Sequence, residues 1–351
     1  MLGYLGEGIS IRNFLSCGDW LVPRTNQAYG MTAWFEIKAK ADFRVRDPFT
    51  YFRFRQETGE EGATTDGPVA AELRERGLST RTAIVKKAML HGRYPTSGIV
   101  LGRGPNDLTS DEIEEARSEC HPFLHEHIGV VVYAMHNGMY EPYEKRYVDL
   151  VLKKLKPEAF TDSAVCCAVL TEYVAETKNE VVAAQKLFRE LETSASSGAV
   201  VFTTNLQPDK VIGLRQGNMP LYVIVSKKGS FLASDLSIVR ELEDEKVEVF
   251  GLRNGGLATL GQSSSSFTNI DNPQEPAHYG RFVIRKTRLN GVEMERCHSC
   301  ESTRSWVHGE EKWDRRSTTR WSIWPDEELC LLCAAERAER QKGPIQDGIE
   351  L

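Results

Sequence analysis

The clearest hydrophobic segment of the chain is Val130–Met135, which ends in the tripeptide His136-Asn137-Gly138. The segment is short, rich in β-branched residues and flanked by histidines, so it predicts a buried strand. Asn-Gly is a turn signal, because glycine accepts a positive φ at no steric cost. The pattern therefore predicts a strand that ends in a turn at Asn137-Gly138.

Extended and helical patterns alternate through the first 260 residues. Strands are expected at 1–6, 33–37, 130–135, 198–203, 221–225 and 231–233, and a closing hairpin at 246–250 and 256–260. Helices are expected within 9–21 and at 69–87, 148–155, 163–175 and 181–191, and another after a capping sequence at 109–112. Helix-rich stretches between clusters of strands indicate a mixed α/β (α+β) fold.

Composition limits the classes of protein that fit. A hydrophobic content of 40% and a charged content of 27% are ordinary for a globular protein, and the net charge of −6 gives no reason to expect nonspecific nucleic-acid binding. No apolar run is long enough to cross a membrane, and the first residues lack the features of a signal peptide. Four of the eight cysteines lie outside the Cys-x-x-Cys pairs of the chain, and such free cysteines are typical of a reducing compartment. We therefore expect a cytoplasmic protein without a membrane partner.

The C-terminal region contains two Cys-x-x-Cys pairs separated by 29 residues, with ligands Cys297, Cys300, Cys330 and Cys333. Four thiolates complete a tetrahedral shell, which predicts one structural Zn²⁺ rather than a catalytic zinc with an open position. A disulfide or redox pair is the alternative. The spacing resembles a treble-clef zinc finger, and a module this small needs the metal to fold.

Domain boundaries follow from these patterns. We expect one large domain at 1–261, a linker rich in Ser, Asn, Pro and Gly at 262–290, the zinc finger at 291–343 and a tail at 344–351. The finger carries a basic run from Arg304 to Arg320 that fits phosphate, although acidic side chains outnumber basic ones by 13 to 9 over residues 291–351. We therefore expect the finger to be a docking surface for a protein partner, in preference to a nucleic-acid-binding surface.

Five motifs in the large domain occur in the order of a known family. They are Arg93-Tyr-Pro-Thr96-Ser-Gly98, His136-Asn137-Gly138, Asp162 at 25 residues after Asn137, Gly213–Leu221 and Phe231–Asp235. Together they resemble the glutaminase domain of class II (N-terminal nucleophile) glutamine amidotransferases, over roughly residues 1–260. The resemblance implies the four-layer α/β/β/α sandwich of N-terminal-nucleophile hydrolases.

The resemblance also implies roles for individual residues. Arg93 is expected to pair with the α-carboxylate of glutamine, Thr96 to add a hydrogen bond, and Asp162 to pair with the α-ammonium. The Asn137 side chain and the Gly138 backbone N–H are expected to form the oxyanion hole. Taken singly, the same residues could be a surface ion pair and an ordinary turn; their order and spacing favour the glutamine site.

The nucleophile of the family is missing. Its members begin Cys-Gly-Ile-x-Gly, whereas this sequence begins Met-Leu-Gly-Tyr-Leu-Gly and places Leu2 at the cysteine position. A hydrocarbon side chain cannot attack an amide, and loss of a covalent nucleophile costs several orders of magnitude in rate. Exposure of Cys17-Gly18 by cleavage after Ser16 is the alternative, although Asp19-Trp20 does not continue the family pattern.

Three hypotheses of function follow. The first is a pseudo-enzyme that binds glutamine or a related amino acid and acts as a sensor, scaffold or assembly subunit. The second is an active amidotransferase that delivers ammonia to a separate synthase. The third is an adaptor that binds protein or nucleic acid through its zinc finger. The sequence favours the first.

Overall fold

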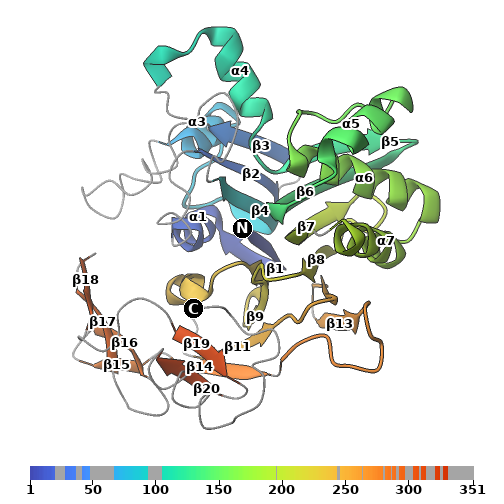
Figure 1. The fold of residues 1–351 in the computed structure, drawn as a ribbon. Coiled ribbons are helices and arrows are strands. Elements are labelled where there is room, and N and C mark those ends of the chain that lie inside the picture. The colour runs from blue at the N-terminus through green and yellow to red at the C-terminus, as the bar shows by residue number, and fades with distance from the viewer. Residues whose placement is uncertain are drawn as a thin grey trace.

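Two antiparallel sheets organise the N-terminal four fifths of the chain (Figure 1). The computed structural model describes residues 1–19, 28–36, 42–47, 67–93, 105–194, 196–242, 246–262, 264–279, 281–285, 287–289, 292–296, 303–307, 310–313, 321–324 and 327–330. No helix within these ranges has both the length and the apolar character needed to cross a membrane.

The first sheet has eight strands in the order β14-β11-β9-β10-β1-β4-β2-β3. Their bounds are β1 Leu2–Ser10, β2 Ala28–Phe35, β3 Asp42–Asp47, β4 Ile84–Arg93, β9 Tyr222–Ser226, β10 Gly229–Ala233, β11 Lys246–Gly251 and β14 Phe282–Arg285. The N-terminal strand β1 lies between β10 and β4, so it is a central strand of this sheet.

The second sheet has six strands in the order β13-β12-β8-β7-β6-β5. Their bounds are β5 Phe123–His127, β6 Val130–Met139, β7 Ser197–Thr204, β8 Val211–Gln216, β12 Gly256–Leu260 and β13 Ser265–Asn269. The strand predicted at 130–135 is therefore confirmed as part of β6, and it continues four residues further than expected, to Met139. The turn predicted at Asn137-Gly138 was wrong, because both residues lie within the strand and pair with β7.

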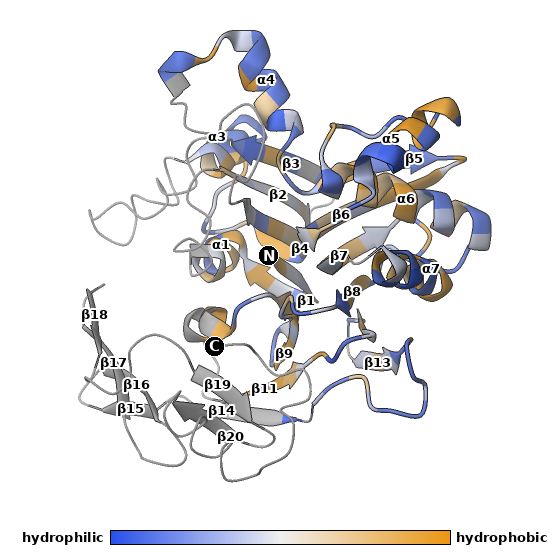
Figure 2. Ribbon diagram, viewed as in Figure 1, coloured by the Kyte–Doolittle hydropathy of each residue, from blue (hydrophilic) through white to orange (hydrophobic). Residues whose placement is uncertain are grey.

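Helices cover both sheets (Figures 1 and 2). The α-helices are α1 Ile11–Asp19, α3 Pro68–Glu75, α4 Ser110–Ser118, α5 Tyr143–Leu152, α6 Asp162–Thr177 and α7 Glu180–Thr193, and the 3₁₀ helices are η3 Pro105–Asp107 and η4 Leu236–Glu241. The cap predicted at 109–112 is confirmed, because Thr109 and Glu112 form a capping box at the start of α4.

Three apolar clusters show how these elements pack. One contains Leu2 and Tyr4 of β1 with residues of α1 and α3, and a second joins α5, α6 and α7 to the six-stranded sheet. The third draws residues from both sheets, including Met1 and Leu5. Because side chains alternate along a strand, β1 contributes to the helix-side cluster at Leu2 and Tyr4 and to the cluster between the sheets at Leu5.

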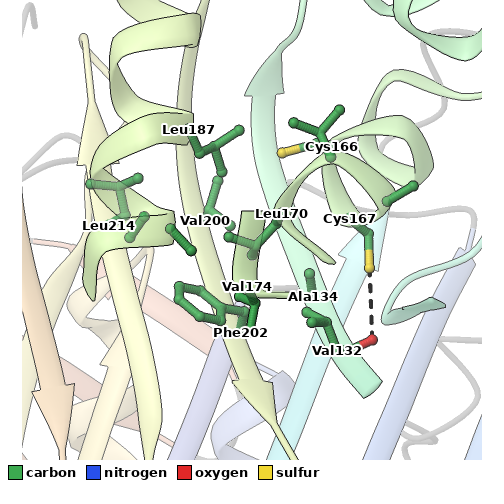
Figure 3. Close-up of a cluster of buried hydrophobic side chains, with 14 of the residues drawn as sticks. Val132, Ala134, Cys166, Cys167, Leu170, Val174, Leu187, Val200, Phe202 and Leu214 are labelled. Atoms are coloured by element: carbon green, nitrogen blue, oxygen red, sulfur yellow. Dashed lines mark hydrogen bonds between the residues drawn. The ribbon is translucent and has the colours of Figure 1, made fainter. Parts of the chain in front are cut away.

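Helix α6 is apolar almost all round, and ten of its residues are buried. Figure 3 shows Leu170 of α6 beside Val200 and Phe202 of the six-stranded sheet, and the Cys167 thiol directed to the Val132 carbonyl, to which it is hydrogen-bonded at 3.8 Å. The Thr161 hydroxyl accepts the Ala164 N–H and caps the start of α6, and Lys178 in the left-handed conformation ends it. Packing thus fixes the position of the first turn of α6.

Two further expectations for secondary structure were wrong. The helix expected at 69–87 is α3, which ends at Glu75; Gly77 follows with φ of 72°, and the chain then enters β4 at Ile84. The strands expected to form a closing hairpin belong to different sheets, because β11 pairs with β9 and β12 pairs with β8. Periodicity in sequence identified the strands of this pair but not their partners.

The segment expected to be a linker contributes an edge strand to each sheet. β13 pairs with β12, and β14 pairs with β11. β13 is polar and exposes one face, and such an edge strand needs few apolar residues, which explains why its composition resembles that of a linker.

The C-terminal described residues form two small antiparallel sheets. One contains β15 Thr287–Leu289, β16 Val292–Arg296, β17 Thr303–Val307 and β18 Glu310–Trp313; the other contains β19 Trp321–Trp324 and β20 Glu327–Cys330.

Candidate functional site

The Asn137 side chain lies on the face of β6 that looks toward the eight-stranded sheet. Asn137 pairs with Ala199 of β7, and Ala199 belongs to the cluster between the sheets together with Met135 and Met1. Since side chains alternate, Asn137 shares this face with Met135, whereas His136 lies on the opposite face, toward α6. The half-buried amide of Asn137 is thereby placed on the same side of β6 as the start of β1.

Gly138 approaches β7 too closely for any side chain. Its φ is 153°, and a Cβ atom built on it would lie 2.0 Å from the Ser197 carbonyl oxygen. Glycine is therefore required at this position by the close approach of two backbones.

The register of β6 shows where the Gly138 N–H points. The Asn205 N–H donates to the Val131 carbonyl at 3.1 Å, so the hydrogen-bonded pairs with β7 fall at odd-numbered residues of β6. The N–H of Gly138 accordingly points to the other edge, where β5 pairs no further than Ala134. This N–H is thus directed to an edge that β5 does not cover.

Asp162 lies at that same edge. It is the first residue of α6, and its Oδ2 accepts the Tyr140 N–H at 3.3 Å while its Oδ1 accepts the Ser163 N–H at 2.7 Å. The fold therefore brings Gly138 and Asp162 to one edge of β6, although 23 residues lie between them in sequence.

His136 connects the strand to this carboxylate. Its Nδ1 lies 3.2 Å from the Ser163 hydroxyl and 3.8 Å from Asp162 Oδ2. Burial lowers the pKa of His136, and the Asp162 carboxylate and the Ser197 carbonyl oppose that shift. Sequence reasoning did not assign a role to His136 or Ser163, although each is adjacent to a residue that it did select.

Leu2 is completely buried and belongs to the cluster on the helix side of the eight-stranded sheet. It pairs with Leu90 of β4 and Ala233 of β10. At the neighbouring position, the Met1 amine donates to the Ser234 hydroxyl at 3.0 Å, and the Ser234 N–H donates to the Met1 carbonyl at 3.1 Å. The position expected to hold the nucleophile therefore carries a hydrocarbon inside the core.

The cysteines whose side chains are described, Cys17, Cys120, Cys166 and Cys167, are all buried. Burial raises the pKa of both Cys166 and Cys167, which keeps them protonated at neutral pH. Cys17 lies within α1, in the same core cluster as Leu2.

Other predicted site residues fall wholly or partly outside the described residues. Arg93 is the last residue of β4 and its backbone pairs with Ala28, but its side chain lies outside them, as does Thr96. Cys297, Cys300 and Cys333 also lie outside, and only the backbone of Cys330 is described, at the end of β20 opposite Trp321. Elsewhere in the described ranges, no group of His, Cys, Asp and Glu side chains is arranged to hold a metal ion.

Comparison with known proteins gives structural matches without sequence matches. No family model and no curated protein sequence matches the chain. The fold is similar to that of the glutamine phosphoribosylpyrophosphate amidotransferase from B. subtilis complexed with ADP and GMP, with a TM-score of 0.51, 12% identity and coverage of 77% of this chain and 48% of that one. A structure described as the allosteric regulatory enzyme of purine biosynthesis gives the same values.

A predicted glutamine amidotransferase from Pseudomonas aeruginosa PA01 matches with a TM-score of 0.36, 10% identity and coverage of 68% of this chain and 86% of that one. The chain spans about half the length of the first two proteins. The likeness to them establishes a mixed α/β fold of the amidotransferase type.

Proposed function

We propose that this protein binds glutamine, or a closely related amino acid, at the edge of β6 and does not hydrolyse it by a covalent route. The observation that carries the proposal is the contrast between two places in the fold. Gly138 and Asp162 lie at one edge of β6, next to Asn137, which supports a glutamine site there. Leu2, which the resemblance assigns to the nucleophile position, is a fully buried hydrocarbon. A binding site without a nucleophile fits a glutamine sensor, a scaffold or an assembly subunit.

Each group of the ligand has a counterpart in this proposal. The Asp162 carboxylate receives the α-ammonium group, and Arg93 with Thr96 receives the α-carboxylate. The Asn137 amide and the Gly138 N–H hold the oxygen of the side-chain amide. Without a thiolate, the same donors bind the ground-state amide, and no tetrahedral intermediate forms.

The arrangement of the sheets supports the finer description of the fold. The cluster between the two sheets and the helical cluster on each outer face are what a four-layer α/β/β/α sandwich requires. We extend the proposal to a separate C-terminal module in which Cys297, Cys300, Cys330 and Cys333 hold a structural zinc ion. That module is the candidate docking site for a protein partner or nucleic acid.

The active-enzyme alternative through Cys17 has a structural cost. Cleavage before Cys17 would remove β1 from its place between β10 and β4, together with the buried side chains of Leu2, Tyr4 and Leu5. An eight-stranded sheet that loses a central strand loses two ladders of hydrogen bonds and part of both adjoining cores.

Calorimetric titration with L-glutamine tests the proposed site. The unmodified chain should show saturable binding, and Asp162→Asn should weaken it at least about tenfold, because the ammonium group loses a charged acceptor. Asp111→Asn is a matched control, since Asp111 lies in the first turn of the exposed helix α4. Equal affinities for the Asp162→Asn and Asp111→Asn variants would remove Asp162 from the site.

A further inference from the structure

The Asp162 carboxylate is oriented by groups from two elements. The Ser163 N–H and hydroxyl donate to Oδ1 at 2.7 and 3.2 Å, and the Tyr140 N–H at the end of β6 donates to Oδ2 at 3.3 Å. The side chain of Asp162 is still 29% exposed. The carboxylate is thus held in one orientation while part of it stays accessible to a ligand.

The His136 imidazole is enclosed between β7 and α6. Its side chain is 1% exposed, and a Cβ atom at Gly198 would lie 2.4 Å from Nε2, so β7 leaves no room for the ring to move on that side. On the other side, Nδ1 meets the Ser163 hydroxyl at 3.2 Å. The hydroxyl of Ser163 therefore connects a fixed ring to the carboxylate.

The charge on this cluster is set by burial. A protonated imidazole would lose its hydration here, which is why the pKa of His136 is lowered even though Asp162 from α6 and the Ser197 carbonyl from β7 favour the proton. A neutral His136 contributes no positive charge to balance the Asp162 carboxylate. An external cation can then serve as that partner.

The geometry differs from a nucleophilic triad. In a Ser-His-Asp triad, the hydroxyl and the carboxylate contact opposite nitrogens of the imidazole. Here Ser163 Oγ and Asp162 Oδ2 both face Nδ1. The hydroxyl and the carboxylate therefore share one nitrogen of the ring, and the cluster is suited to orienting a carboxylate.

We propose that His136 and Ser163 are positioning residues that hold Asp162 toward the open edge of β6, so that it selects ligands carrying a primary ammonium group. The inference rests on the glutamine site proposed above and deepens it, because it identifies which part of the ligand the cluster recognises. Selection acts through orientation: a carboxylate that rotated freely about its bonds would bind a cation less well.

The test compares two ligands on three versions of the full-length chain. L-glutamine and glutaramate, which is glutamine without its amino group, are titrated into the unmodified chain, Ser163→Ala and Ser163→Thr. Ser163→Ala should raise the Kd for L-glutamine about tenfold, the effect of losing a hydrogen bond to a charged group. Ser163→Thr keeps the hydroxyl and should restore the affinity, while the Kd for glutaramate should be the same for all three.

A second serine provides the control. Ser118→Ala removes a hydroxyl that donates to the Glu115 carbonyl on the exposed helix α4, and it should leave both affinities unchanged. Thermal unfolding of each variant shows whether it is folded. Equal glutamine affinities for the unmodified chain and Ser163→Ala, or a parallel loss for both ligands, would overturn the positioning role while the glutamine site stands. Absence of glutamine binding by the unmodified chain would instead overturn the proposed function itself.

Discussion

The three residues of the His136-Asn137-Gly138 motif each contact a different part of the molecule. His136 contacts the start of α6, Asn137 faces the other sheet, and Gly138 lies against the backbone of β7. A strand makes this division possible because successive side chains alternate. The motif therefore needs three different residue types for three separate physical reasons.

Replacement of Gly138 by alanine should destabilise the protein by about 1–3 kcal/mol, the cost of a strained backbone together with a clash against the Ser197 carbonyl. Gly129→Ala is the matched control, because Gly129 also has a positive φ of 72° but has open space around it. Denaturant unfolding measures both. A cost for Gly138→Ala no greater than that for Gly129→Ala would show that the close approach to β7 is not rigid.

The burial of Lys87 predicts how the free energy of unfolding depends on pH. Its ammonium group is buried between the sheets, 3.2 Å from the Thr203 hydroxyl, 2.9 Å from the Pro208 carbonyl and 3.8 Å from the centre of the Trp34 ring, and burial lowers its pKa from 10.5 to about 8. Between these two values the unfolded chain binds more protons than the folded chain, so this group makes the free energy of unfolding rise with pH. Below about pH 8 its destabilising effect is fully present.

The variant Lys87→Met should therefore show a flatter dependence of stability on pH between 8 and 10.5 than the unmodified chain. The difference between the two curves, measured by denaturant unfolding, isolates this group from other titrations. Identical slopes would mean that the amine is better solvated than its burial indicates.

At the scale of elements, the site depends on the end of one strand and the start of one helix. β6 supplies Asn137 and Gly138, and α6 supplies Asp162, so the packing of α6 against the six-stranded sheet determines their separation. The Thr161 cap fixes the first turn of α6 at this junction.

Thr161→Ala should cost about 1 kcal/mol of stability, because the Ala164 N–H loses its capping oxygen. It should also weaken glutamine binding, since the first turn of α6 carries Asp162. Thr109→Ala removes the equivalent cap of α4 and should leave glutamine binding unchanged. If the two variants had the same effect on glutamine binding, the first turn of α6 would have no special role in the site.

Sequence patterns identified these elements better than their partners. The strand at 130–135 and the helices near 163–175 and 181–191 were predicted correctly because their residues show strong periodicity or a continuous apolar character. The pairing of β11 and β12 with different sheets depends on contacts between distant residues, which local patterns do not contain. The polar edge strand β13 lacked a recognisable pattern because only one of its faces packs.

For the candidate site, too, local patterns indicated residues but not their contacts with distant residues. Gly138 and Asp162, selected by resemblance, lie at one edge of β6, and their role in binding stays a prediction. The contact of His136 with Ser163 could not be predicted from the sequence. It arises only when β6 and α6 pack, with glycine at position 198 leaving room for the ring. A short-range motif indicates the candidate residues of a site, whereas tertiary packing determines which neighbouring side chains orient them.

At the scale of the whole molecule, strand β1 matters both for the proposed function and for the stability of the fold. The strand is central in the eight-stranded sheet, and its side chains fill the core on both faces. In this position the second residue contributes to packing through Leu2 and contributes no reactive group. On the proposed function, the fold is kept while the covalent chemistry is lost.

The most direct measurement follows binding and ammonia release together when the full-length chain is mixed with L-glutamine. We predict a saturable heat of binding with no sustained heat of turnover and no accumulation of ammonia. Continuous heat with stoichiometric ammonia release would contradict the claim that the site binds without hydrolysis. Absence of both heat and ammonia at millimolar glutamine would contradict the claim that the site binds glutamine.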